Sequence, residues 1–424
     1  MPKESVLRDS GFAETGKGPR RRLGVVLYAL AGAVFVLAAA MGYFFAGDVL
    51  ERIYTPSMRV HADFDTFWAS SRALLDGEDA YQTGSEFANL NPPFWVLLTV
   101  PFAFVEPLTG YRLFVALMAL MQATALLWML YELRPGGRVG PLAGALAVVA
   151  LLVSSPLLAT LALGQMYPVL ALGLVAAWAW DRRDREASSG VALGLVVALK
   201  PSLAPVLLWP LVRQRWGTLG AAVVAGAAAT LAGAIVVGRE AAMGWVDLML
   251  DTTANPYWDN ASLPAAAARL FTGHEYGESV AMLPGLVSVF GLAGVALVLV
   301  TAYRARRGSE WGLWALTAAA LLASPIAWHN YLLLIAPGVL LLLERGRADV
   351  AAVLIALQLI PPQWPLLWQE NEPAAQTVGP ALVALALSLY LFILLAHWAA
   401  FFTASGEETP EEAAADVRTG EAYP

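Results

Sequence analysis

The sequence predicts an all-α fold, that of a polytopic membrane protein with about twelve transmembrane helices. Apolar residues make up 58% of the 424 residues and charged residues only 14%, against roughly a quarter in an ordinary soluble domain. The charges also gather near the two chain ends, so the long stretch from Leu23 to Ala404 is depleted of them. No packing in water hides so much apolar surface, which excludes a soluble enzyme and a nucleic-acid-binding protein.

The first predicted span covers residues 23–46. It follows Arg20, Arg21 and Arg22 and is too long for the core of a signal peptide, so we expect a retained helix behind a cytoplasmic tail of residues 1–22. Further apolar stretches cover residues 109–132, 139–160, 166–180, 188–199, 202–212, 217–238, 284–303, 311–326, 330–343, 350–366 and 376–402. The acidic residues 403–424 are expected to form a disordered cytoplasmic tail.

Basic residues cluster in the short connections between these spans. The clusters are Arg134 and Arg138; Arg182, Arg183 and Arg185; Arg213 and Arg215; Arg304, Arg306 and Arg307; and Arg345 and Arg347. Twelve crossings put every cluster and both termini on the cytoplasmic side, as the positive-inside rule requires. Two longer segments, about 47–91 and 239–283, then lie outside. Neither is large enough for a separate domain, so an active site would be shared between these loops and the helices.

The count of twelve requires that residues 92–105 do not cross. This stretch is short, begins with two prolines and is broken by a third, which favours a re-entrant or interfacial segment after the first outer loop. The pieces 188–199 and 202–212 meet at Lys200-Pro201. They are alternatively one kinked helix, which would change the parity of the crossings.

Lys200 is the one lysine outside the N-terminal tail. An ionisable group at membrane depth costs at least a few kcal/mol unless it is paired or hydrated, so it is a functional candidate. Its compact ammonium group suits an anionic partner such as a lipid phosphate. The alternative is a structural lysine whose ammonium group reaches the headgroup level.

Asp63 and Asp65 lie among aromatic residues in the first outer segment. An acid beside aromatic rings is costly to desolvate, which sets these two apart from a solvated acidic loop, the alternative reading. Carboxylates at i and i+2 share a face only in an extended segment; on a helix they diverge, so at most one points into a given site. One carboxylate beside an acceptor hydroxyl is sufficient for general-base catalysis.

His329 and Asn330 lie in a polar and aromatic cluster between two spans on the predicted outer side. Headgroup anchoring is the alternative explanation for such a cluster. The chain has four well-separated histidines and no cysteine, so neither a metal site nor a disulfide is predicted.

A set of short motifs occurs in order along the chain. They are Asp63 with Phe67, Ala73-Leu74-Leu75-Asp76-Gly77 with Tyr81, Asn91-Pro92-Pro93-Phe94, Gly164-Gln165, Leu199-Lys200-Pro201, Asn260-Ala261-Ser262-Leu263, and Ser324-Pro325 through Trp328. In this order they resemble the GT-C glycosyltransferases of family 87, bacterial mannosyltransferases that use polyprenyl-phosphate mannose. The resemblance extends over roughly Leu23 to Ala400. The sequence departs from the family pattern at Phe67, Ala261, Tyr167 and His329-Asn330, and these departures concern the sugar and the acceptor.

The resemblance implies a GT-C membrane glycosyltransferase that moves a hexose, mannose in the family, from a polyprenyl-phosphate donor to a lipid or glycan acceptor on the extracytoplasmic side. It implies Asp63 as the base and Lys200 as the group that stabilises the departing phosphate. The residues implied in binding the donor phosphate or sugar are Lys200, His329, Asn330, Gln165 and Asn260, with Asp65 a second candidate carboxylate. One displacement predicts inversion at the anomeric carbon. Because the leaving group is a single phosphate, no metal or other cofactor is expected. A metal ion bound with the help of the second carboxylate, Asp65, stays an alternative.

The competing class is a transporter or flippase of lipid-linked or anionic solutes, in which Lys200 is the substrate counter-charge. It explains the lysine but not the acidic, aromatic first outer segment. A related GT-C enzyme that uses another lipid-linked pentose or hexose, or that glycosylates protein, is a further alternative. The expected partners are the lipid-linked donor, the glycolipid or glycan acceptor and the bilayer, with no nucleic acid.

Overall fold

The structure, a computed structural model, describes residues 18–134, 137–306, 310–363 and 380–405. Over these ranges the regular elements are all helices, and pairing between extended segments is limited to two isolated bridges. The all-α prediction is therefore confirmed. Most of the two predicted tails, residues 1–17 and 406–424, lies outside the described residues.

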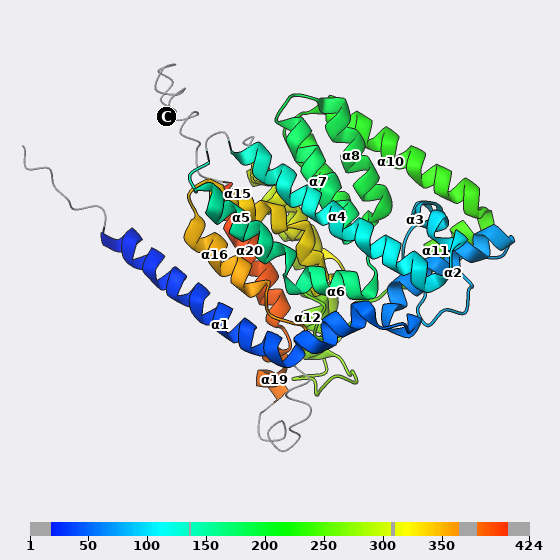
Figure 1. Cartoon of the computed structure of the whole chain (residues 1–424), viewed down its shortest axis with the longest axis horizontal. Helices are drawn as coiled ribbons and strands as arrows, with labels where there is room; N and C mark the ends of the chain where they lie inside the picture. Colours follow the sequence, from blue (N-terminus) through cyan, green and yellow to red (C-terminus); the bar gives the residue numbers. More distant parts are fainter. Residues whose placement is uncertain (1–17, 135–136, 307–309, 364–379, 406–424) are drawn as a thin grey trace, which may run out of the picture.

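The helices follow one another mostly with short connections, and longer ones cover residues 77–92, 251–262 and 272–284 (Figure 1). They are α1 Gly18–Tyr54, η1 Met58–His61, α2 Ala62–Asp76, α3 Pro93–Thr99, η2 Val100–Phe104, α4 Pro107–Leu133, α5 Pro141–Leu152, α6 Ser155–Leu163, α7 Tyr167–Asp181, α8 Glu186–Leu199, η3 Pro201–Leu207, α9 Leu208–Val212, α10 Trp216–Val237, α11 Arg239–Leu250, α12 Leu263–Phe271, α13 Gly285–Ala305, α14 Gly312–Ala323, η4 His329–Leu334, α15 Ala336–Glu344, α16 Ala348–Leu357, α19 Pro380–Ala386 and α20 Leu389–Ala404. Those labelled η are 3-10 helices.

Four of the described helices are long and apolar enough to cross a membrane: α4, α10, α13 and the Leu23–Met41 part of α1. A fifth span is formed if α5 and α6, which meet at a 40° bend, are counted together. Large apolar side chains such as Val224 and Ile235 of α10 are exposed, as on a surface that faces lipid rather than water. Most of the other predicted spans coincide with shorter apolar helices, whereas 330–343 is divided between η4 and α15, and residues 364–366 and 376–379 of two spans lie outside the described residues. A membrane protein is therefore supported, and the count of twelve stays a prediction.

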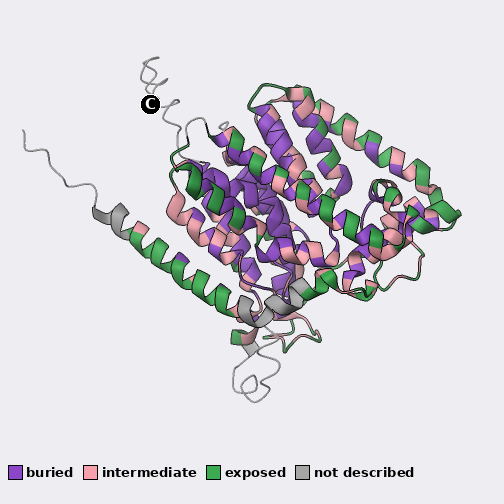
Figure 2. Ribbon diagram, in the orientation of Figure 1, coloured by how far each residue is buried: buried purple, intermediate pink, exposed green. Residues whose placement is uncertain are grey.

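The interior of the bundle is formed by α14, η4 and α15, whose residues are almost all buried. Figure 2 shows this buried centre enclosed by helices with exposed outer faces, of which α1 is the clearest example. The polar cluster of His329 and Asn330 begins η4 and is therefore inside the protein. An anchor in the headgroup region would be exposed, so burial argues against that reading.

Ion pairs bring the basic connections together at one end of the bundle. Glu310 binds both Arg182 and Arg345, at 2.8 and 2.7 Å. Arg183 pairs with Glu132 in the last turn of α4 at 2.6 Å, so the end of α4 joins the same group of contacts. The clusters of Arg182 and of Arg345 thus share one end with the end of α4, as a common membrane side requires.

Prolines account for two differences from the predicted boundaries. α1 continues past residue 46 to Tyr54, into the predicted outer loop, and ends before Pro56, because the residue before a proline disfavours the α conformation. The step at Lys200 has extended angles, φ −143° and ψ 84°, for the same reason, so α8 and η3 are separate helices. Residues 92–105 form α3 and η2, packed on α2, α4 and α10.

Two glycines on α8, Gly190 and Gly194, allow this helix to pack closely on α10. A Cβ on Gly194 would overlap the backbone of Ala222 and of Gly226, and one on Gly190 would overlap the backbone at Thr218. Small residues four apart are a common means by which membrane helices approach each other. The contact fixes α8, at whose end Lys200 lies.

Gly194→Ala is expected to destabilise the protein by about 1 to 3 kcal/mol, because the added methyl group must push two backbones apart. The matched control is Gly220→Ala on α10, where no atom lies within 4 Å of an added Cβ. Thermal unfolding in detergent measures both variants. An equal midpoint for Gly194→Ala and the wild-type protein would contradict the close packing.

Candidate active site

Asp63 lies in the first turn of α2 and is half-buried. Its neighbours Phe64 and Phe67 are buried and hold this face of α2 against the bundle. The surrounding protein raises the pKa of the Asp63 carboxyl to about 6 by desolvation. A hydrogen bond from the Gln165 side chain and the charge of Lys200 oppose the rise. Three residues from remote parts of the sequence, all predicted for the site, therefore interact, Gln165 with Asp63 by a hydrogen bond and Lys200 with Asp63 through its charge.

Gly164 explains how Gln165 reaches Asp63. This glycine ends α6 with φ at +75°, in the left-handed region that L-residues rarely adopt. A Cβ at this position would overlap the Cβ of Phe64, the residue next to Asp63. The glycine thus allows the turn and also the close approach of α2.

His61 fastens the start of α2 to the same turn. Its Nδ1 lies 2.8 Å from the carbonyl oxygen of Ala162 and its Nε2 lies 3.0 Å from that of Thr55. The ring stacks on Tyr111 at 3.6 Å, and the Tyr111 hydroxyl donates to the carbonyl of Leu161 at 2.8 Å. Two residues before Asp63, the backbone is thereby tied to the end of α6.

Lys200 is half-buried and points toward η4. Its Nζ donates a hydrogen bond to the hydroxyl of Tyr331 at 2.6 Å and lies 4.7 Å from the centre of that ring. The Tyr331 ring packs on Tyr167 at 4.4 Å. Among the described residues no carboxylate forms an ion pair with the Lys200 ammonium, so the site keeps a positive charge whose field reaches Asp63.

Asp65 has a different environment. It lies near Glu86, whose negative charge adds to desolvation in raising the pKa of Asp65. Asp63 instead faces Gln165 and Lys200. The two carboxylates diverge from the helix, as their i and i+2 spacing predicted.

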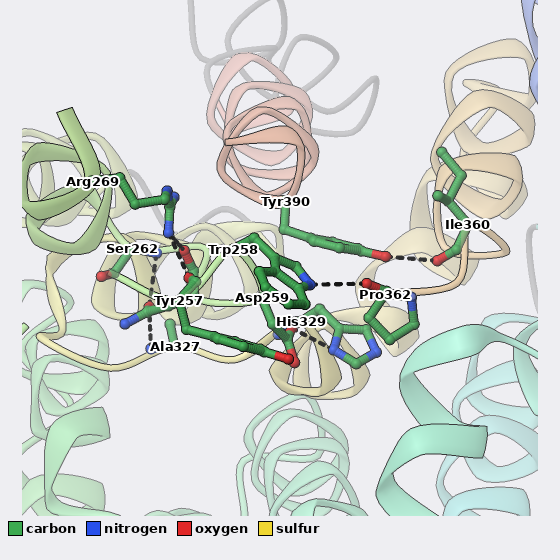
Figure 3. Close-up of polar contacts among 11 residues, drawn as sticks. Tyr257, Trp258, Asp259, Ser262, Arg269, Ala327, His329, Ile360, Pro362 and Tyr390 are labelled. Atoms are coloured by element: carbon green, nitrogen blue, oxygen red, sulfur yellow. Dashed lines mark hydrogen bonds and ion pairs between the residues drawn. The ribbon is translucent and has the colours of Figure 1, made fainter. Parts of the chain in front are cut away.

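His329 is paired with Asp259, a residue that the sequence reasoning missed. One oxygen of the Asp259 carboxylate accepts from the backbone N–H of His329 at 2.7 Å and lies 2.5 Å from its Nδ1. Nε2 is buried and has no hydrogen-bond partner among the described residues. The Tyr167 hydroxyl interacts electrostatically with both Asp63 and Asp259, so the histidine pair adjoins the cluster around Asp63. Figure 3 shows Asp259 between Tyr257 and His329.

Asn260 is fully buried, and its amide joins two segments by their backbones. Nδ2 donates to the carbonyls of Asn255 and Pro325, both at 3.0 Å, and Oδ1 accepts from the N–H of Ala327 at 2.9 Å. Asn330 is also buried, but its Oδ1 has no partner within the described ranges. Asn260 is thus committed to protein contacts, whereas Asn330 retains an acceptor.

Arg269 of α12 also supports this loop and was not predicted. Its Nη1 donates to the carbonyl oxygens of Tyr257 and Asn260, at 2.7 and 3.0 Å (Figure 3). Full burial lowers the pKa of Arg269 to about 10, although the charge of Asp259 opposes the shift. A single arginine in an Ala-rich segment carries no sequence signal of this role. Asp259 could have been considered from its place beside the Asn260 motif.

Comparison with known proteins now adds to this geometry. Residues 89–325, more than half of the chain, match the model of glycosyltransferase family 87. The chain belongs to glycosyltransferase family 87. It is therefore a glycosyltransferase, as the motifs predicted, and the transporter alternative is not favoured.

The chain is similar to proteins named polyprenol-phosphate-mannose-dependent alpha-(1-2)-phosphatidylinositol mannoside mannosyltransferase. The one from Mycobacterium tuberculosis is 29% identical over 370 residues, which cover 80% of this chain and 81% of the relative. That from Mycolicibacterium smegmatis is 27% identical, covering 82% and 87%. An alpha-(1->3)-arabinofuranosyltransferase of Corynebacterium glutamicum is 29% identical over 163 residues, 37% of this chain and 38% of the relative.

Asp63→Asn is expected to stabilise the folded protein at pH 7.5 by about 1 to 3 kcal/mol. The folded pKa, about 6, lies above the ordinary 3.8, so ionisation costs stability above pH 6 and the cost disappears as the pH falls toward 4. Thermal unfolding at pH 7.5 and 4.5 measures the difference. Asp76→Asn, which breaks an exposed pair with Arg72 at the other end of α2, is the control. Equal stabilisation at both pH values would refute the burial of this charge.

Proposed function

We propose that the protein transfers a hexose, mannose, from a polyprenyl-phosphate donor to a lipid or glycan acceptor on the extracytoplasmic side of the membrane. The observation that carries the proposal is the placement of Asp63, partly accessible and with a pKa of about 6, within the field of Lys200. The names of the mannosyltransferase relatives support the donor and the glycolipid acceptor. The arabinofuranosyltransferase relative keeps a lipid-linked pentose as the second candidate sugar.

The reaction is a single displacement. Asp63 takes the proton of the acceptor hydroxyl as its oxygen forms the new bond to C1 of the sugar. The bond between C1 and the phosphate oxygen breaks, and its electron pair leaves with the polyprenyl phosphate. The new bond forms on the face opposite the leaving group, so the anomeric configuration is inverted. Asp63 then releases its proton to water.

Lys200 stabilises the phosphate, whose negative charge grows as the bond to C1 breaks. His329 offers Nε2 to the phosphate or to a sugar hydroxyl, and Asn330 offers Oδ1, an acceptor, to a sugar hydroxyl, which accounts for two buried polar atoms that lack partners in the described structure. Gln165 holds the Asp63 carboxylate in place. Asn260 acts through the loop that carries Asp259, and Asp65 lies beside an outer loop where an acceptor can approach.

The membrane arrangement of the proposal keeps twelve crossings, with residues 92–105 as a re-entrant or interfacial segment. The tails, residues 1–22 and 403–424, are cytoplasmic and flank a transmembrane domain over 23–402. The positions of Gln165 and Lys200 support this arrangement. Gln165 precedes α7 and Lys200 follows α8, so each lies at the helix end opposite the basic connections, about 20 Å away along the helix. With the basic end inside, the site lies outside.

Asp63→Asn is expected to lower the rate of mannosyl transfer by about 10² to 10⁴-fold, the usual contribution of a general base. Asp65→Asn, matched in chemistry and two residues away, is expected to retain most activity. Turnover of purified protein in lipid vesicles is measured with polyprenyl-phosphate mannose and with the corresponding arabinofuranose donor, and the glycolipid products are identified by mass spectrometry. Normal turnover by Asp63→Asn would show that Asp63 is not the general base. Exclusive use of the arabinofuranose donor would show that the transferred sugar is arabinofuranose and not mannose.

Lys200→Gln is expected to raise KM for the donor and to move the acid limb of the pH profile to higher pH. The wild-type kcat/KM should fall about tenfold per pH unit below about 6, because protonated Asp63 is not a base. Loss of the Lys200 charge removes an interaction that lowers this pKa. Lys200→Arg keeps the charge and should leave the limb in place. A limb that does not move in Lys200→Gln shows that the two groups are not coupled.

A further inference from the structure

Helix α11 directly follows α10, a helix long and apolar enough to cross a membrane. It has 12 residues and is therefore about 18 Å long, too short for a hydrocarbon core of about 30 Å. Gly238 separates the two helices with φ at +87°, an angle that L-residues rarely adopt, so the chain can turn there. Because α10 begins beside Arg215, α11 lies at the helix end remote from that basic connection. The glycosyl-transfer mechanism uses none of its residues.

An apolar stripe and an acidic stripe run side by side along α11. They are Met243, Val246 and Leu250, and Glu240, Asp247 and Asp251, of which the last directly follows the helix. Met243 and Leu250 are 52% and 79% exposed, and all three acidic residues are exposed. Successive helical residues are rotated by about 100°, so the centres of the two stripes lie about 90° apart around the axis. Ala241 is buried and lies nearly opposite the apolar stripe.

These positions give each face of α11 a direction. The apolar stripe points away from the protein, and the acidic stripe points roughly at a right angle to that direction. Such a division matches a helix at a membrane surface, with lipid beside it and water above it. The exposed apolar surface of α10 also reaches its last turn, at Ile235 and Val236, so the surface that faces lipid extends to the start of α11.

Trp245 joins α11 to the first outer segment. Its Nε1 donates a hydrogen bond to the carbonyl oxygen of Leu90 at 3.2 Å. Tryptophan is enriched at membrane surfaces, where its ring meets lipid and its N–H meets polar groups. The neighbouring Asn89 donates from Nδ2 to Oγ of Ser70 on α2 at 2.9 Å. These contacts connect α11 to α2, the helix that carries Asp63.

We propose that α11 lies in the plane of the membrane surface at the end of α10, with its apolar stripe among the acyl chains of phospholipids and its acidic stripe in water. The helix and Asp251 together carry one arginine and three carboxylates, a net charge of −2. Attraction to anionic headgroups therefore does not hold the helix at the surface, and burial of the apolar stripe does. The partner is the acyl region of a zwitterionic lipid surface.

Single cysteines report the surroundings of each stripe, because the chain has no cysteine of its own. Met243→Cys, Leu250→Cys and Asp247→Cys are spin-labelled in the full-length protein in phosphatidylcholine vesicles. Electron paramagnetic resonance measures collisions of each label with oxygen, which concentrates in lipid, and with a water-soluble nickel complex. We expect the ratio of oxygen to nickel collisions to be severalfold higher at positions 243 and 250 than at 247. Ile235→Cys on α10 is the lipid-facing reference.

Three outcomes would overturn the proposal. A ratio at positions 243 and 250 as low as that at 247 would place the apolar stripe in water. Few collisions with either reagent at 243 and 250 would show that protein, such as a second copy of the chain, covers the stripe. A high ratio found only after anionic phosphatidylglycerol is added would show that charge holds the helix. All the replaced side chains are exposed, so unchanged thermal midpoints are expected and confirm that the variants are folded.

Discussion

The electrostatic relation between Asp63 and Lys200 is the constraint on which the reaction end of the molecule depends. An acid enclosed by protein tends to stay protonated, and a lone ammonium at membrane depth is costly. Placed near each other, each charge lowers the cost of the other, and the pKa of Asp63 comes to about 6. At neutral pH the carboxylate is then ionised but remains a better proton acceptor than an ordinary aspartate. This balance requires that α2 and the end of α8 keep a fixed separation.

That separation is maintained by contacts with backbone atoms. The ring of His61 lies between two backbone carbonyl oxygens, 2.8 and 3.0 Å from its nitrogens, and Asn260 joins the backbones of two segments through both ends of its amide. Gly164 contributes by having no side chain, so that Phe64 can approach. Backbone atoms move less than side-chain ends, and a bond to them places a whole segment. The candidate site residues His329 and Asn330 can therefore keep free polar atoms while backbone contacts hold the segments that carry them.

The sequence predicted what depends on local properties. Hydropathy located α4, α10 and α13, and helical periodicity predicted that Asp63 and Asp65 diverge. The rarity of lysine singled out Lys200. Asp259 and His61 escaped notice because their roles arise from contacts 70 and 101 residues away in sequence, which no local pattern encodes. The end of α1 at Tyr54 was missed because hydropathy falls at residue 47 while the helix, free of proline, continues.

Charged side chains at the basic end of the bundle pair with one another. At the basic end, Glu310 closes pairs with Arg182 and Arg345, which fixes the connections and prevents charges from facing lipid unpaired. At the other end, His329 Nε2 and Asn330 Oδ1 are buried without partners in the described structure, at a cost of about 1 to 3 kcal/mol each. Under the proposed function, a donor that supplies the missing partners recovers this cost, so part of its binding free energy is stored in the folded protein. Filling these positions with protein contacts would stabilise the fold and weaken the site.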